Sequence, residues 1–298
     1  LQPRIQVSLF SILEEKEIQI RGFKVRLPLD IQFIFTSNPE DYTNRGTIVT
    51  PLKDRVGSQI LTHYPESIEI AKKITKQESK IDSELGSKIH IPEVARDIIE
   101  QISFEARESD LVDRKSGVSA RMSITSLQNL VSSAERRMII NKEAKTSIRM
   151  SDFSSVISSI NGKVELVYEG EEEGAEQVSY NLISSAVKSI FNKYFPKIEK
   201  LTKPDEITPY DSLLNWFSNK QLVINDNLNN KDYENLLNEV IDAKKLIKKY
   251  IPELNDDDEL FFVEFILWGL ESYNKLSILR TNNGIEYKDP FNNFINKI

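Results

Sequence analysis

Between residues 92 and 195 the sequence repeats apolar side chains at the spacing of α-helices and offers almost no strand pattern in between. Apolar residues three and four positions apart share one face of a helix, whereas a half-buried strand alternates at every second residue. The successive segments are IPEVARDIIEQISFEARE, SARMSITSLQNLVSSAERRMIIN, RMSDFSSVISSI and VSYNLISSAVKSIFNKYF. A chain with this pattern has to bury helix against helix, so the sequence predicts a helical domain here.

The first 78 residues follow a different pattern, which predicts mixed α and β structure. Pro3 suits the first turn of a helix, and the apolar residues after it recur at helical spacing. Alternation around Arg21-Gly22 predicts a β-hairpin. The apolar run DIQFIFTS (30–37) predicts a buried strand of a parallel sheet. Residues 50–65 then predict a short helix that ends at Gly57 and a strand that stops at Pro65, before helical spacing resumes.

The last hundred residues predict a second helical module. Two prolines in KLTKPDEITPYD (200–211) indicate a linker, and helical spacing returns in residues 233–251 and 259–276. The carboxylate run NDDDEL (255–260) lacks the spacing of an EF-hand and is expected to cap the helix that follows. Residues 163–177 predict a short strand and a solvated acidic loop. A cluster in the last helical segment is expected to form core: Phe261, Phe262, Phe265, Trp268 and Leu270.

Composition excludes several classes of protein. The chain has no Cys and two separated His residues, His63 and His90, so neither a disulfide framework nor a protein-ligated metal site is expected. We interpret His63 as the last residue of a strand rather than a ligand or base. No apolar run approaches 18 residues and no secretory leader is evident, which predicts a soluble cytoplasmic protein. Residues 161–298 carry a formal charge of about −8, which disfavours nucleic acid as their partner.

The polar end of the strand in FIFTSNPEDYTNRG (33–46) has two readings. Asn, Pro, Asp and Gly are common in turns, so Asn38 can be a turn residue. Alternatively, Asn38 lies at the carboxyl edge of a sheet, where α/β proteins place ligands. Taken alone, Arg55 and Arg121 are most simply solvated or ion-paired cations.

Taken together, FIFTSNPEDYTNRGTIVTPLKDRVG and GVSARMSITSLQNLVSSAERR resemble the AAA+ ATPases of the MoxR and magnesium chelatase I-subunit group. The resemblance covers about residues 1–195. It implies the carboxyl-terminal part of an AAA+ α/β core over residues 1–78, with a parallel sheet and a β-hairpin insertion. An all-α lid over residues 79–198 and an acidic helical module over residues 199–298 would follow.

The resemblance assigns roles to three residues. Asn38 matches sensor 1, which orients a water or senses the γ-phosphate and therefore counts as both a catalytic and a nucleotide-contacting residue. Arg55 in LKDRV matches the catalytic arginine finger that reaches a neighbouring subunit's nucleotide, with Asp54 beside it to fix its geometry. Arg121 in SARM matches the nucleotide-contacting sensor 2, although Ala stands where the family has Pro. An arginine fits such roles because its guanidinium group stays charged and can donate two hydrogen bonds to phosphate oxygens.

The hairpin resembles the family's pre-sensor 1 insertion, which projects toward the pore or the partner of the ring. Arg21, Lys24 and Arg26 make it basic. A solvated surface hairpin without a partner is the alternative.

Two nucleotide motifs of the family are missing from these 298 residues. There is no GxxxxGK[ST] phosphate loop and no apolar strand that ends in Asp-Glu to hold Mg²⁺. In the family both precede a helix like the one that opens this chain, so we expect a carboxyl-terminal fragment that alone binds nucleotide weakly and hydrolyses none. The complete protein is expected to use ATP and Mg²⁺ in a homo-oligomeric ring, a hexamer in particular.

The resemblance implies remodelling of a partner protein, commonly one with a von Willebrand factor A domain. One alternative is a non-catalytic interaction scaffold derived from an AAA+ fold, and another is the ATPase subunit of a metal chelatase. A transcriptional regulator of the enhancer-binding kind would need a basic recognition helix, and the acidic second half offers none that we can identify.

Overall fold

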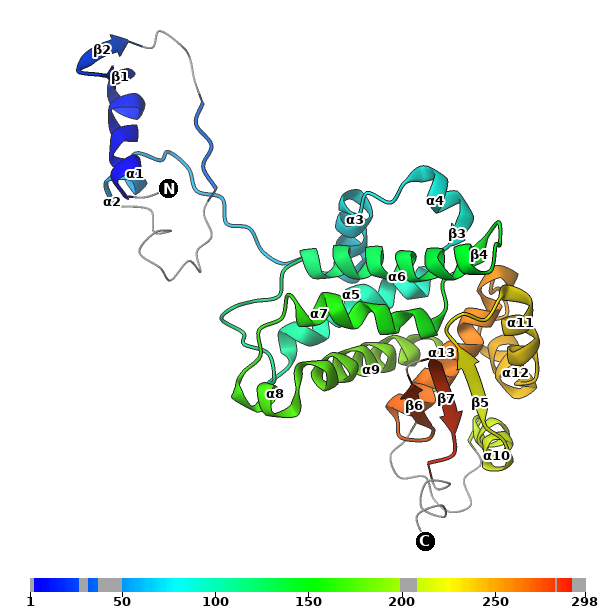
Figure 1. Cartoon of the computed structure of the whole chain (residues 1–298). Helices are drawn as coiled ribbons and strands as arrows, with labels where there is room; N and C mark the ends of the chain where they lie inside the picture. Colours follow the sequence, from blue (N-terminus) through cyan, green and yellow to red (C-terminus); the bar gives the residue numbers. More distant parts are fainter. Residues whose placement is uncertain (1–2, 27–31, 37–49, 199–207, 282, 291–298) are drawn as a thin grey trace. The chain divides into compact units, whose positions relative to one another are not determined.

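The computed structural model describes residues 3–26, 32–36, 50–198, 208–281 and 283–290 (Figure 1). The chain divides into two compact units, Leu1–Tyr64 and Pro65–Ile298. Each unit is described by itself.

The first unit contains the predicted amino-terminal helix and hairpin. Helix α1 (Pro3–Phe10) continues into a π-helical turn η1 (Ser11–Glu15), which ends at Lys16 in the left-handed region. Strands β1 (Glu17–Ile20) and β2 (Phe23–Arg26) pair antiparallel. Arg21 and Gly22 between them both have positive φ, 49° and 87°, as a tight hairpin turn requires. Helix α2 (Thr50–Lys53) is a single turn.

The prediction of two strands after the hairpin is wrong for the residues that the structure describes. Residues 32–36 and 56–65 form no regular secondary structure, and the single-turn helix ends at Lys53 rather than Gly57. Ile34, Ile60 and Leu61 are 82%, 89% and 79% exposed. A parallel strand satisfies its backbone only through neighbouring strands. The described part of this unit provides no such neighbour, and the hairpin is its one sheet.

The helices predicted between residues 65 and 195 are confirmed. The region is not all-α as expected, because it also contains a short pair of strands. Helices α5, α6 and α9 pack together, and α3 packs on α5 and α6 (Figure 1). Strands β3 (Ile89–His90) and β4 (Thr146–Ser147) form a short parallel pair. The helices are α3 (Ile68–Glu78), α4 (Ser83–Lys88), α5 (Glu93–Glu108), α6 (Arg121–Ile140), the 3₁₀ turn η2 (Met150–Val156), α7 (Ile157–Asn161), α8 (Tyr168–Glu173) and α9 (Ala175–Tyr194). Helix α8 occupies the acidic segment that was expected to be a loop.

The last segment is also helical, but it contains a sheet that the sequence reading missed. Strands β5 (Leu222–Asn225), β6 (Ser277–Thr281) and β7 (Gly284–Lys288) are antiparallel, in the order β5-β7-β6. The helical elements are α10 (Asp211–Asn219), α11 (Asn230–Asn238), α12 (Ile241–Tyr250), the 3₁₀ turn η3 (Asp256–Asp258) and α13 (Glu259–Ser272). The Asn255 side chain accepts from the Asp257 amide and caps η3. The expected capping of α13 by this run is not found, because Asp258 at its amino end makes no side-chain cap hydrogen bond.

Helix α13 lies at the centre of the second unit, against α9 (Figure 1). The five apolar residues expected to form core here are all buried. The Glu264 carboxylate of this helix is fully buried too, and it accepts hydrogen bonds from the hydroxyls of Tyr233 and Tyr287 and from the Met150 amide, at 2.7, 2.9 and 3.1 Å. One hydrophobic core therefore contains residues from both 79–198 and 199–298.

Candidate functional site

The three residues assigned by the resemblance lie in parts of the chain that are described separately or not described. Asn38 lies outside the residues that the structure describes. Arg55 belongs to the first compact unit and Arg121 to the second. Each arginine is therefore considered in its own surroundings.

Arg55 is held by three contacts within its own unit. It follows α2, and its Nη1 donates to the Pro51 carbonyl at 2.6 Å. Its Nε lies 2.8 Å from Glu14 Oε1 at the end of η1, and its guanidinium carbon lies 4.8 Å from the centre of the Phe10 ring. The side chain is 28% exposed. The arginine is thus oriented by α1, η1 and α2, and one side of it remains accessible to solvent.

The carboxylate that pairs with Arg55 is Glu14, and the adjacent Asp54 forms no ion pair with it. The sequence reading named Asp54 because it is the neighbour in the motif. Glu14 precedes Arg55 by 41 positions, and only the fold of this unit brings the two together. No local sequence signal could have identified it.

Arg121 is the first residue of α6, and its side chain is exposed. The Ser119 hydroxyl accepts from the Arg121 amide at 3.2 Å, and the Thr125 hydroxyl donates to the Arg121 carbonyl at 2.8 Å. Its guanidinium forms no ion pair with any described residue. The amino end of this 20-residue helix adds partial positive charge beside it. The arrangement suits an anion such as a phosphate group.

A buried polar cluster lies behind the first turn of α6. The Ser123 hydroxyl is 2.7 Å from the Ser103 hydroxyl of α5, and both residues are buried. Glu100, also on α5, is 3% exposed. Burial raises the pKa of Glu100, and the polar side chains of Thr75 and Ser123 oppose the rise. The sequence reading missed Glu100 because a single Glu in an amphipathic helix usually faces solvent.

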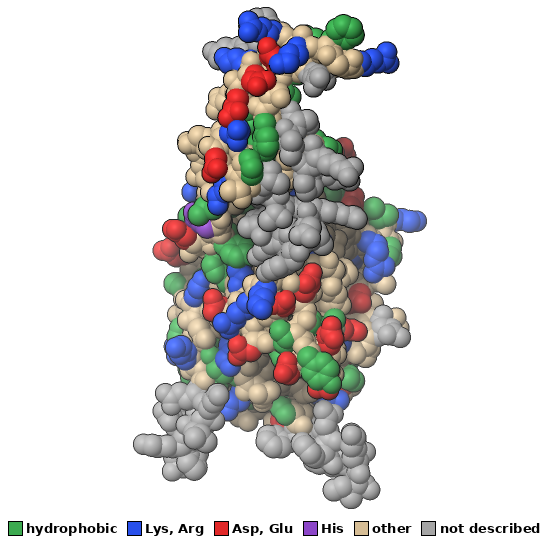
Figure 2. Space-filling model, turned by 90° about the vertical axis from the view of Figure 1, so that its left-hand side faces the viewer, with side chains coloured by type: hydrophobic (Ala, Val, Ile, Leu, Met, Phe, Trp, Pro, Cys, Tyr) green, Lys and Arg blue, Asp and Glu red, His purple; other side chains and the backbone are tan. Residues whose placement is uncertain are grey.

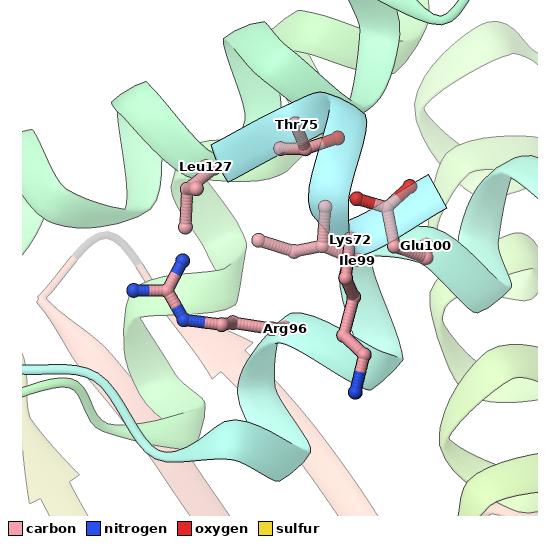
Figure 3. A pocket seen from close by; sticks show the side chains of 6 residues that line it. All are labelled: Lys72, Thr75, Arg96, Ile99, Glu100 and Leu127. Carbon is pink, nitrogen blue, oxygen red and sulfur yellow. The ribbon is translucent and has the colours of Figure 1, made fainter. Parts of the chain in front are cut away.

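A small cavity of about 10 Å³ adjoins this cluster (Figure 3). That volume corresponds to about one water molecule and is far too small for a nucleotide. It is lined by Lys72, Thr75, Arg96, Ile99, Glu100 and Leu127.

Lys72 links α3 to α5 through ion pairs beside the cavity. Its ammonium lies 2.9, 2.8 and 2.7 Å from carboxylate oxygens of Glu69, Glu93 and Asp97. Burial alone would lower the pKa of Lys72, but hydrogen bonds to Asp97, Glu93 and Glu69 raise it above its ordinary value. The side chain is therefore a permanent cation that is already neutralised by its neighbours.

The hairpin presents apolar as well as basic side chains. Lys24 Nζ and Arg26 Nε lie 3.4 and 3.3 Å from Glu17, and hydrogen bonds from Arg26 and then Lys24 lower the pKa of that carboxylate. Ile20 and Phe23 beside the turn are 55% and 77% exposed. The hairpin tip is therefore an exposed surface of mixed character.

The two histidines make ordinary contacts. His63 is exposed, with Nδ1 2.8 Å from the Tyr64 carbonyl oxygen. His90 Nε2 lies 2.6 Å from Asp258 Oδ1 and links β3 to η3. Among the described residues no group of three or more His, Asp or Glu side chains is placed to hold a metal ion. Each helix in the described part of the chain is too short or too polar to cross a membrane.

Comparison with known proteins gives no relative. No protein-family model matches this chain, and no curated protein and no solved structure is significantly similar to it. The functional interpretation therefore depends on the residues described above.

Proposed function

We propose that this chain supplies the sensor 1, arginine finger and lid residues of a cytoplasmic AAA+ ATPase of the MoxR and magnesium chelatase-like group. The complete protein would bind ATP with Mg²⁺ and work as a homo-oligomeric ring, a hexamer in particular. Hydrolysis in the ring would remodel a partner protein, one with a von Willebrand factor A domain being the type that the resemblance suggests.

The placement of Arg121 is the observation that carries this proposal. The resemblance locates sensor 2 at the start of a lid helix, and Arg121 begins the 20-residue helix α6 with an exposed guanidinium. No described carboxylate competes for it. A guanidinium group is permanently charged and can donate two parallel hydrogen bonds to phosphate oxygens. The partial positive charge at the amino end of the helix adds to this attraction.

Arg55 would act on the nucleotide of the neighbouring subunit. Phosphoryl transfer depends on positioning and on neutralising the charge of the transferring group, and an arginine supplied from a neighbour can raise turnover by about 10³ to 10⁵. The contacts of Arg55 with Glu14 and the Pro51 carbonyl hold the guanidinium in one orientation before it meets its target. The phosphate loop and the Mg²⁺-binding carboxylates would have to come from outside residues 1–298.

The partner is proposed to be a protein rather than a nucleic acid. On the face shown in Figure 2, acidic and basic side chains are interspersed, and the described residues of that face form no continuous basic field. Duplex or single-stranded nucleic acid would require such a field.

A non-catalytic scaffold derived from an AAA+ fold is the second candidate. One observation favours it: Arg55 already has an ion-pair partner, a carbonyl partner and an aromatic partner inside its own unit. A finger in a working site has to exchange some of these contacts for phosphate oxygens. A scaffold would keep them.

Nucleotide affinity of the complete protein tests the proposal. We expect Arg121→Ala to weaken the binding of ATP about tenfold or more, because a hydrogen bond to a charged group contributes about 1.5–3 kcal/mol. Arg114→Ala is the matched control, since Arg114 is an exposed arginine of the same unit that pairs with Asp110. Equal affinity of wild type and Arg121→Ala would contradict the sensor 2 role.

A further inference from the structure

The hairpin β1–β2 is an amphipathic sheet of two strands. Residues that pair across an antiparallel sheet point their side chains to the same side, and neighbours along each strand alternate between sides. Ile18 pairs with Val25 and Ile20 pairs with Phe23, so these four apolar side chains share one side, which we call the apolar face. Ile20, Phe23 and Val25 are 55%, 77% and 43% exposed, and Ile18 is half-buried. The apolar face is therefore largely open to solvent.

The opposite side and the turn of the hairpin carry three cations. Lys24 and Arg26 lie on the opposite side, where they approach the carboxylate of Glu17 at 3.4 and 3.3 Å. Their side chains nevertheless remain 70% and 87% exposed. Arg21 in the turn forms no ion pair with any described residue. Three cations against one carboxylate leave residues 17–26 with a formal charge of +2.

The size of the apolar face limits what can cover it. A sheet of only two strands becomes stable when its apolar side is packed against something else. The four side chains expose on the order of a few hundred Å², whereas each partner of a specific protein complex contributes about 800 Å². The apolar face is thus too small for a stable protein interface of its own. A lipid surface needs no matching shape, and its attraction grows with the apolar area inserted and with the opposite charge.

We propose that this hairpin is a peripheral membrane-binding element, whose apolar face enters the headgroup region of an anionic lipid bilayer. Arg21, Lys24 and Arg26 would meet the anionic headgroups, because long cationic side chains lay their stems along apolar surface and keep the charge in water. The sheet is a single layer, so these charges stay within the screening length of about 8 Å at physiological ionic strength.

The place of the hairpin in its unit suits this role. Strands β1 and β2 lie at the η1 end of the first helical stretch, whereas α2 packs against α1 (Figure 1). The turn between the strands, with Arg21 and Phe23 on either side of Gly22, is therefore remote from α2 within this unit. Membrane binding of this kind requires no nucleotide, so its test is independent of the proposed ATPase activity.

Co-sedimentation of the complete protein with lipid vesicles tests the proposal. Vesicles of phosphatidylcholine alone are compared with vesicles of equimolar phosphatidylcholine and phosphatidylserine. We expect binding to the mixed vesicles to be about tenfold or more stronger, and to weaken as added salt screens the charges. Equal binding to both kinds of vesicle would overturn the proposal. A protein that binds neither would also overturn it and leave a protein partner as the occupant of the apolar face.

Substitutions in the hairpin locate the binding surface. We expect Phe23→Ser to weaken binding to the mixed vesicles about tenfold and Arg21→Gln about fivefold, because one inserted ring and one headgroup contact are lost. Ile139→Ser and Arg114→Gln are the matched controls, since these side chains are 64% and 63% exposed and belong to the second unit. Hairpin variants that bind like wild type, or controls that lose as much, would overturn the assignment.

A tryptophan in the turn reports insertion directly. Phe23→Trp keeps a large apolar ring at a 77% exposed position, and Trp is favoured at the membrane–water interface. We expect its fluorescence to shift to shorter wavelength with the mixed vesicles and to be quenched by brominated lipid. Wild type is the control, because Trp216 and Trp268 both lie in the second unit. A Phe23→Trp protein that sediments with vesicles without this shift would bind through another surface, which would overturn the proposal.

Discussion

Gly269→Ala should destabilise the protein, against the usual effect of this substitution in a helix. Gly269 lies within α13, where Ala normally adds about 1 kcal/mol over Gly. A Cβ at this position would lie 2.2, 2.5 and 2.8 Å from three atoms of the Phe191 ring on α9. Carbon atoms do not approach so closely, so either the ring or the helix has to move.

The Phe191 ring has no free space into which it could move. It is fully buried, and four aromatic rings surround it within 6.4 Å between centroids: Phe195, Tyr210, Phe265 and Tyr273. Overpacking of a core typically costs about 1–3 kcal/mol. After subtraction of the gain in helix propensity, Gly269→Ala should lower the free energy of unfolding by up to about 2 kcal/mol.

Urea denaturation followed by tryptophan fluorescence measures this change, because Trp216 and Trp268, the two tryptophans of the chain, both lie in the second unit. Gly86→Ala is the matched control. Gly86 lies inside α4, and a Cβ there would meet no atom within 4 Å. This variant should gain about 0.5–1 kcal/mol. A Gly269→Ala protein that gains as much stability as Gly86→Ala would refute the close contact of α9 with α13.

Two further predictions concern the buried carboxylate of Glu264. Tyr287→Phe removes a hydroxyl that donates to Glu264 at 2.9 Å and accepts from the Trp268 indole at 2.8 Å, so urea denaturation should show a loss of about 1.5–3 kcal/mol; an unchanged midpoint would contradict this network. Burial raises the pKa of Glu264, so the stability linked to its protonation is fully present below its unfolded pKa and is lost as pH rises through the folded value. Stability curves of wild type and Glu264→Gln should therefore diverge across that acidic window, and parallel curves would contradict the raised pKa.

Long apolar periodicity was sufficient to predict the helices. Helices α5, α6, α9 and α13 each present a repeated apolar pattern over 14 or more residues, and burial of such a face leaves few alternatives. The hairpin was predictable because Arg21-Gly22 interrupts an alternating pattern.

Short strands were not predictable, because their formation depends on neighbours that local sequence does not specify. Strand β5 has four residues, of which Leu222 and Ile224 are buried and Val223 and Asn225 are exposed. This alternation is too brief to stand out between helices, and β7 completes it from about 60 positions away. Conversely, residues 30–37 were predicted to be a buried strand and the residues after Gly57 a strand that stops at Pro65, yet the described residues offer them no pairing partner.

The residues of the candidate site show the same limit of prediction from local sequence. Arg55 and Arg121 could be named from their motifs, since a motif is local. Glu14 could not be named, because its contact with Arg55 arises from the packing of separate elements.

Steady-state ATP hydrolysis by the complete protein, wild type against Arg55→Ala, tests the central claim most directly. Lys53→Ala is the control, because Lys53 is an exposed cation two residues away on α2. The AAA+ interpretation predicts that Arg55→Ala keeps its affinity for ATP and loses turnover by about a thousandfold or more, whereas Lys53→Ala retains both. A complete protein without turnover, or an Arg55→Ala variant as active as wild type, would contradict the arginine finger and favour the scaffold.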